Sequence, residues 1–289
     1  MTPRVALTIA GSDSGGGAGL QADLKAFAAH GVFGTSAVTA VTAQNTTAVL
    51  GVVAMDPSFV VAQIDAVLTD LSVAAVKTGM LATPETIAAV AEIARHRSFP
   101  NLVVDPVLVS STGHPLLGEG GVEAYLERLI PRATVLTPNL REAAVLCGVD
   151  VASLDSTDAM AACAEQLRAL GATWVVVKGG HLSRLEHAEN DDALRSSPDV
   201  VAGPRGISVL QATRVPTAND HGTGCSLSAS IAAGLALGRD PLSAIEEAKA
   251  YVGRALLGAS GWRLGAGHGP IDHFGWTPAP DAIGRGAPS

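Results

Sequence analysis

The sequence predicts an α/β fold in which helices cover both faces of a mostly parallel central sheet. Short apolar, β-branched runs alternate with segments that repeat apolar residues at helical spacing, and this alternation is typical of βαβ units. Several of the short runs are apolar on both faces, as expected for strands buried within a parallel sheet. Neither an internal repeat nor a linker breaks the pattern, so we expect residues 1–275 to form a single domain.

Seven short apolar or β-branched runs are predicted as strands. They comprise residues 4–10, 36–41, 49–54, 74–78, 102–107, 134–137 and 173–178. Most of the segments between them repeat apolar residues every three or four positions, which predicts helices. A capping residue before a proline marks two helix starts, at Thr83-Pro84 and at Asp240-Pro241. The alanine-rich segment after Gly224 predicts a further helix, packed closely against the sheet.

Two stretches lack such a pattern. Residues 183–206 are polar and punctuated by Gly and Pro, so we expect a surface loop or a short lid. Residues 276–289 show no period, so we expect a loosely ordered tail. Because ligands of open parallel sheets bind at the carboxyl ends of the strands, the residues that follow each strand are the candidates for a site.

Composition excludes several classes of protein. The net charge is −8 with only 19 Lys and Arg, and aromatic residues make up 3%. Nucleic-acid binding is therefore not expected, because it draws on clustered cations and stacking rings. The chain has no apolar run long enough to span a membrane and no signal-peptide pattern at its start. A cytoplasmic protein without membrane contact is the prediction.

The three cysteines, Cys147, Cys163 and Cys225, are odd in number and form no CxxC or Cys/His cluster. We therefore expect neither a disulfide framework nor a zinc site.

A glycine-rich segment follows the first predicted strand. Gly17, Gly19 and Ala22 match the G-x-G-x-x-G/A dinucleotide fingerprint, but residues 37–44 lack the acidic side chain that would hold a ribose. Two other interpretations remain: a tight turn that needs glycine, or a loop whose backbone approaches a small substrate closely.

The sequence Gly222-Thr223-Gly224-Cys225 stands directly before the predicted alanine-rich helix. Glycines at a helix start leave backbone N–H groups unpaired, and with the helix dipole these form an anion site. The same position favours a thiolate, so we expect the pKa of Cys225 to fall. The alternative is a small buried thiol at a crowded helix start.

Carboxylates at strand ends suggest a place for a hard cation. Asp105 ends one predicted strand, and Glu142 stands on the first turn of the helix after Asn139. Mg²⁺ prefers one or two carboxylates together with phosphates and waters. Equally, Asn139 and Glu142 have the spacing of a helix capping box.

The Walker A and Gly-x-Ser-x-Gly patterns are absent, but the chain resembles a known family from Val5 to about His273. It is similar to the hydroxymethylpyrimidine/phosphomethylpyrimidine kinases of thiamine biosynthesis, within the ribokinase-like superfamily. The resemblance rests on seven segments in family order: residues 10–23, 38–46, 77–81, 104–107, 137–143, 177–181 and 221–225.

The resemblance implies a three-layer α/β/α fold without a large lid domain. It implies an enzyme that uses ATP and Mg²⁺ to phosphorylate 4-amino-5-hydroxymethyl-2-methylpyrimidine, and then phosphorylates the monophosphate to the diphosphate. It also implies a homodimer.

On the substrate side, the resemblance implies that Gln44 hydrogen-bonds the pyrimidine edge, since its amide both donates and accepts. Met80 and Val107 would line the faces of the ring, unless they are ordinary core residues. Gly11 would let the backbone approach the substrate closely.

On the phosphate side, the resemblance makes Gly222, Thr223, Gly224 and Cys225 an anion hole for the transferring group. Cys225 is a base in place of the Asp of other ribokinase-like enzymes, or an element of the anion hole. The remaining residues are expected to serve the nucleotide (Asn139 and Lys178) and Mg²⁺ (Asp105 and Glu142).

Some positions depart from the family pattern, and other functions compete. Asp220 adds a negative charge before His221, and Thr42 stands where Val is usual. Asp23, in the first of the seven segments, is either a substrate contact or part of a helix start. A pyridoxal/pyridoxine kinase of the same fold is the alternative, alone or as a second activity. A nicotinamide dehydrogenase and a periplasmic-type binding protein are disfavoured by the missing acid and by the loop before Cys225.

Overall fold

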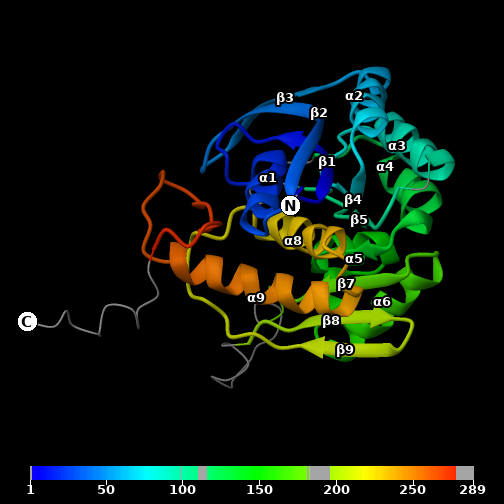
Figure 1. Cartoon of the computed structure of the whole chain (residues 1–289). Coiled ribbons are helices and arrows are strands. Elements are labelled where there is room, and N and C mark those ends of the chain that lie inside the picture. The colour runs from blue at the N-terminus through cyan, green and yellow to red at the C-terminus, as the bar shows by residue number, and fades with distance from the viewer. Residues whose placement is uncertain (1, 98, 110–115, 181, 183–195, 278–289) are drawn as a thin grey trace, which may run out of the picture.

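The computed structural model describes residues 2–97, 99–109, 116–180, 182 and 196–277. Within these residues the centre of the molecule is a nine-stranded sheet with the order β3-β2-β1-β4-β5-β6-β7-β8-β9 (Figure 1). The strands are β1 Val5–Ser12, β2 Phe33–Gln44, β3 Val49–Ala54, β4 Val73–Thr78, β5 Leu102–Val104, β6 Val135–Leu136, β7 Trp174–Lys178, β8 Asp199–Gly203 and β9 Gly206–Leu210.

Six neighbouring strands of the sheet, in the order β2-β1-β4-β5-β6-β7, pair in parallel. Antiparallel strands extend the sheet at both edges. β3 pairs with β2 at one edge, and β8 and β9 follow β7 at the other. Six parallel strands direct their carboxyl ends to the same edge of the sheet, where α/β proteins bind ligands.

Helices cover both faces of the sheet (Figure 1), and the sheet separates the core into two layers. One layer lies under α1 Gly19–Ala29, α8 Thr223–Ala236 and α9 Pro241–Ala259. The other lies under α2 Pro57–Asp70, α3 Pro84–Arg97, α4 Gly121–Ala124, α5 Leu140–Cys147 and α6 Thr157–Ala169. This arrangement is the predicted three-layer fold, and the described residues include no large lid.

Capping side chains begin several of the helices as the sequence predicts. The Thr83 hydroxyl accepts a hydrogen bond from the Thr86 amide at the start of α3, and the Asp240 carboxylate accepts from the Ser243 amide in α9. Each of these caps satisfies an amide that the helix itself leaves unpaired. No helix in the described part of the chain is both long and apolar enough to cross a membrane.

The structure corrects three expectations. The predicted loop at residues 183–206 contains β8 and the first residue of β9; residues 183–195 lie outside the described part. β8 and β9 have five residues each, too few for a clear alternation of apolar and polar residues that would have predicted strands.

Cys147 and Cys163 form a disulfide between the end of α5 and α6. The spacing of cysteines in the sequence does not reveal this pair, because α5 and α6 bring the two residues together only in the folded structure. The strand predicted at residues 102–107 ends at Val104, since Pro106 cannot donate to the sheet. Residues 278–289 of the predicted tail lie outside the described part.

Candidate active site

The candidate site lies where the carboxyl ends of the central strands meet the start of α8. Ala6, Ala75, Val103 and Val176 belong to the core layer on the α8 side. Strand alternation places the residues two positions further along on the same face. These residues are Thr8, Lys77, Asp105 and Lys178, so the apolar layer gives way to a polar row beneath the start of α8.

Residues 222–225, which we call the anion loop, begin α8 with a glycine that no other residue can replace easily. Gly222 caps the helix with φ of 84°, and a Cβ there would overlap the carbonyl oxygen of Gly17. Helix geometry leaves the amides of Gly224 and Cys225 without an intrahelical acceptor. A Cβ on Gly224 would lie 3.2 Å from Lys178 Nζ, so a lysine ammonium stands directly beside the loop.

Asp13 and His221 join the anion loop to the glycine loop at residues 11–19. His221 Nε2 lies 2.9 Å from Asp13 Oδ2, and the same carboxylate accepts hydrogen bonds from the amides of Gly15, Gly17 and Ala18. Burial opposes ionisation of Asp13, but the hydrogen bonds from His221 and Ala18 outweigh it and hold the pKa below its ordinary value.

The contacts of Asp13 decide among the interpretations of the glycine loop. In a dinucleotide site the loop amides bind a pyrophosphate, whereas here three of them are occupied by a side chain of the loop itself. A Cβ on Gly17 would lie 2.5 Å from His221 Cδ2. The glycines therefore serve a tight turn that packs against the anion loop.

A buried charged cluster lies beside the anion loop, next to Gly224. We call it the Lys178 cluster; its members are Asp105, Glu142 and Lys178. Lys178 Nζ lies 3.0 Å from Asp105 Oδ1 and 4.0 Å from Glu142 Oε2, and the Ser228 hydroxyl of α8 donates to Asp105. Burial opposes the charge on Asp105, but Lys178 and Lys77 hold the pKa of this carboxyl below its ordinary value.

Glu142 has two tasks in this cluster. Its carboxylate accepts from the Asn139 amide at 2.8 Å, and the Asn139 side chain accepts from the Glu142 amide at 3.0 Å. The capping box is thus present. Because hard oxygen donors of Asp105 and Glu142 converge on one lysine, the pair also fits a cation held by two carboxylates.

Burial and the charge of Asp105 raise the pKa of Glu142 to about 7, although Lys178 opposes them. A carboxyl whose folded pKa exceeds its ordinary value of 4.5 stabilises the fold fully below that value, and the stabilisation is lost as pH rises through 7. Glu142→Gln keeps the oxygen that caps Asn139. We expect the melting temperature of the wild type, measured against that of Glu142→Gln, to fall between about pH 5 and about pH 8.

Glu127→Gln, at an exposed glutamate, is the control for this comparison and should track the wild type. Parallel melting curves for wild type and Glu142→Gln at every pH would contradict the raised pKa.

The thiol of Cys225 does not behave as the sequence predicts. It is the free cysteine of the chain and is half-buried. Burial raises its pKa to about 12; Lys77 acts against this rise, and Asp105 and Asp23 add to it. The expectation of a lowered pKa is therefore wrong for the free protein, because desolvation outweighs the helix start and Lys77 together.

The residues expected to contact a pyrimidine lie at the ends of β1, β2, β4 and β5. Gln44 is half-buried, and its amide nitrogen lies 3.4 Å from His221 Nε2. Met80 is buried, and its Cε would lie 2.5 Å from a Cβ on Gly11. Gly11 therefore makes room for Met80. Val107 is half-buried after β5.

Sequence reasoning missed the partners of several site residues. The Asp13–His221 pair spans 208 positions, and no short motif connects its members. The buried pair of Lys77 with Asp23 was signalled only by a lysine at the end of the apolar run AAVKT. Asp220 pairs with His268 at 2.7 Å, and both side chains are partly exposed.

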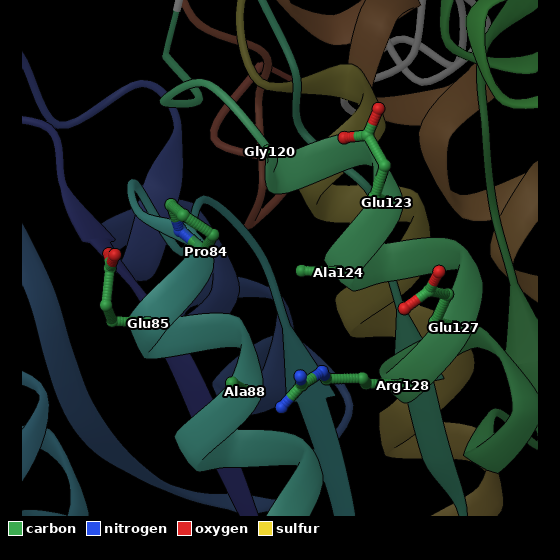
Figure 2. Close-up of a pocket in the computed structure, with 8 residues that line it drawn as sticks. All are labelled: Pro84, Glu85, Ala88, Gly120, Glu123, Ala124, Glu127 and Arg128. Atoms are coloured by element: carbon green, nitrogen blue, oxygen red, sulfur yellow. The ribbon is translucent and has the colours of Figure 1, made fainter.

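A separate surface pocket of about 320 Å³ lies between α3 and α4 (Figure 2). Its lining includes Glu85 of α3, Glu123 of α4, and Glu127 and Arg128 of the helical turn Tyr125–Leu129 that continues α4; the Arg128 side chain extends toward α3. It shares no residue with the site described above.

The site has the parts that phosphoryl transfer requires: backbone amides and a lysine for the transferring group, and carboxylates that can hold a cation beside it. Set at the strand ends of a three-layer sheet without a Walker A loop, these parts define a phosphotransferase of the ribokinase-like class.

Known proteins place the chain more closely. The family model for phosphomethylpyrimidine kinase matches residues 13–272. A hydroxymethylpyrimidine/phosphomethylpyrimidine kinase from Rhizobium meliloti is 48% identical over 93% of this chain and 97% of its own. The chain belongs to the phosphomethylpyrimidine kinase family.

Solved structures agree with this assignment. The phosphomethylpyrimidine kinase of Clostridium difficile has a TM-score of 0.73 at 36% identity, covering 88% of this chain and 99% of its own. The pyridoxal kinase of Staphylococcus aureus, in complex with AMP-PCP and pyridoxal, has a TM-score of 0.83 at 32% identity and covers 96% of both chains.

Proposed function

We propose that the protein uses ATP and Mg²⁺ to phosphorylate 4-amino-5-hydroxymethyl-2-methylpyrimidine to the monophosphate, and then to the diphosphate, for thiamine biosynthesis in the cytoplasm. The observation that carries the proposal is the anion loop, which stands between the Lys178 cluster and the end of β2 with Gln44. A small alcohol held by Gln44 thus has an anion-binding helix start beside it.

The residues divide the work by position. Gln44 orients the pyrimidine edge, and Met80 and Val107 contact its faces. The amides of the anion loop and the Lys178 ammonium stabilise negative charge on the transferring phosphoryl group. Asp105 and Glu142 would hold Mg²⁺, which neutralises phosphate charge when bound, and Asn139 serves the nucleotide. Cys225 takes the proton of the hydroxymethyl group in the first step.

Phosphorylation of pyridoxal is the second candidate activity. It is favoured by the similarity to the Staphylococcus aureus pyridoxal kinase over 96% of both chains. A site that binds one six-membered aromatic nitrogen heterocycle with a hydroxymethyl group has the chemistry to bind the other.

The test is a product assay. The purified protein is incubated with ATP, Mg²⁺ and hydroxymethylpyrimidine, with pyridoxal in a parallel reaction, and the products are identified by mass. We expect the pyrimidine monophosphate to appear first and the diphosphate to follow. A monophosphate that never advances would contradict the second step, and phosphorylation of pyridoxal alone would replace the proposed substrate.

A homodimer is the assembly that we propose, supported by an exposed apolar surface on β2 and β3. Val41 pairs with Val53 across these strands, and both are exposed, as is Leu50 at 76%. Val53→Asp is expected to convert a dimer to a monomer, because the interface would have to bury a charge. Light scattering after size exclusion measures this, with Val145→Asp on α5 as the control at another exposed valine. A wild-type monomer would contradict the proposal.

A further inference from the structure

Asp23 and Lys77 form an ion pair that is wholly enclosed by the protein. Lys77 Nζ lies 2.8 Å from Asp23 Oδ2, and both side chains are 0% exposed. The Thr8 hydroxyl donates to the same carboxylate oxygen at 2.6 Å. Apolar residues of similar volume would stabilise such a place as well or better, because desolvation of two charges offsets their attraction. Packing alone therefore does not explain the pair.

The pair lies directly behind the anion loop. Lys77 is on the α8 side of β4, and a Cβ on Gly79 would lie 2.8 Å from its Nζ. The ammonium thus turns toward the carboxyl edge of the sheet. Asp23 reaches the same point from α1, and α1 packs against α8.

The charge of Lys77 acts on the groups of the site. Burial works against the ammonium, but Asp23, Cys225 and Asp105 together hold the pKa of Lys77 above its ordinary value. Conversely, Lys77 is the main influence that opposes the rise of the Cys225 pKa. Within the described residues, Asp23 Oδ1 has no hydrogen-bond partner, so the carboxylate is held only through the oxygen that faces Thr8 and Lys77.

We propose that Lys77, fixed by Asp23 and Thr8, is a positioning residue of the phosphotransferase site: it supplies a buried positive charge behind the anion loop that stabilises negative charge at Cys225. The proposal rests on the function proposed above for the reaction it assists. It assigns Asp23 the role of holding Lys77, and it makes the ion pair part of the site instead of part of the core.

The Cys225 thiolate is the probe for this charge, because it can be measured without any substrate. The charged groups that face it are Asp23 from α1, Lys77 from β4, Asp105 after β5 and Lys178 from β7. The other two cysteines are joined to each other, so iodoacetamide reports on Cys225 alone, with the modified peptide identified by mass. Alkylation at fixed pH follows the thiolate fraction.

Two single variants are expected to change the alkylation rate in opposite directions. Lys77→Met removes the positive charge, so we expect about tenfold slower alkylation at about pH 8, the effect of one pKa unit. Asp23→Asn removes the opposing negative charge, so alkylation should become faster. A loosened helix start would speed alkylation in both variants, so opposite changes distinguish a charge effect from a structural one.

The double variant Lys77→Met/Asp23→Asn guards against a failure of Lys77→Met to fold, because it leaves no buried charge unpaired. It differs from Asp23→Asn only in the lysine and should react about tenfold more slowly than that variant. Thr78→Val is the matched control on the next residue of β4; its buried hydroxyl has no partner among the described residues, and its alkylation rate should equal that of the wild type.

Equal alkylation rates in Asp23→Asn and the double variant, or rates that rise in both single variants, would overturn the proposal. These outcomes do not depend on the product assay, so a failure of the proposed function would be seen separately. With active enzyme, Lys77→Met should lower kcat for the first phosphorylation while the KM for the pyrimidine stays within about twofold.

Discussion

Gly222→Ala is expected to reduce both phosphorylation steps by at least about a hundredfold, the loss typical of one misplaced oxyanion donor. The helix cap at this position has φ of 84°, and a Cβ would overlap the carbonyl oxygen of Gly17. Either the glycine loop or the start of α8 must move, and the start of α8 carries the amides that face the transferring group. Initial rates of monophosphate and diphosphate formation measure the effect.

Gly253→Ala in α9 is the matched control for this variant. A Cβ there meets no atom within 4 Å, so it should leave both rates unchanged and the fold slightly more stable. If Gly222→Ala melts like the wild type and yet retains its rates, the loop amides do not act on the phosphoryl group.

The first phosphorylation is expected to accelerate with pH, by up to tenfold per unit between about pH 7 and about pH 9, because a base must be deprotonated to act. The pKa of Cys225 is raised to about 12, so the thiolate fraction rises with pH throughout this range. Cys225→Ala should remove this dependence and slow the first step by about a hundredfold or more.

The second phosphorylation serves as the internal control for Cys225→Ala. Its nucleophile is an already ionised phosphate, so it needs no base and should lose much less activity. Equal losses in both steps, or a wild-type first step that is flat with pH, would assign Cys225 to the geometry of the anion loop instead.

How much of the structure could be predicted from the sequence depends on how far apart in the chain the interacting residues lie. The alternating pattern predicted helices on both faces of a mostly parallel sheet, and the rule for parallel sheets placed Asp105 and Asn139 at one edge. The anion loop was predicted from glycines that stand directly before a helix. These inferences succeed because they follow from local patterns and from the common direction of the strands. β8 and β9 were missed because their short segments of alternation fall below the length at which period is informative.

The properties of the site itself were less accessible. The rise in the Cys225 pKa comes from desolvation, which depends on how α1, α8 and the sheet enclose the thiol. The Asp13–His221 pair and the Cys147–Cys163 disulfide are both tertiary contacts. No spacing in the sequence encodes them, and in the case of Cys225 the local rule of the helix start pointed in the wrong direction.

The contact between Asp13 and His221 also bears on how the protein is made. Asp13 is among the first residues to leave the ribosome, whereas His221 follows only after three quarters of the chain. All strands from β1 to β9 therefore leave the ribosome before the anion loop that completes the site. Asp13 in the glycine loop can pair with His221 only after the start of α8 has emerged. A contact between residues so far apart in the sequence forms slowly in folding. A prematurely terminated chain that ends before His221 thus retains Asp105, Glu142 and Lys178 but lacks the anion loop and the histidine that pairs with Asp13.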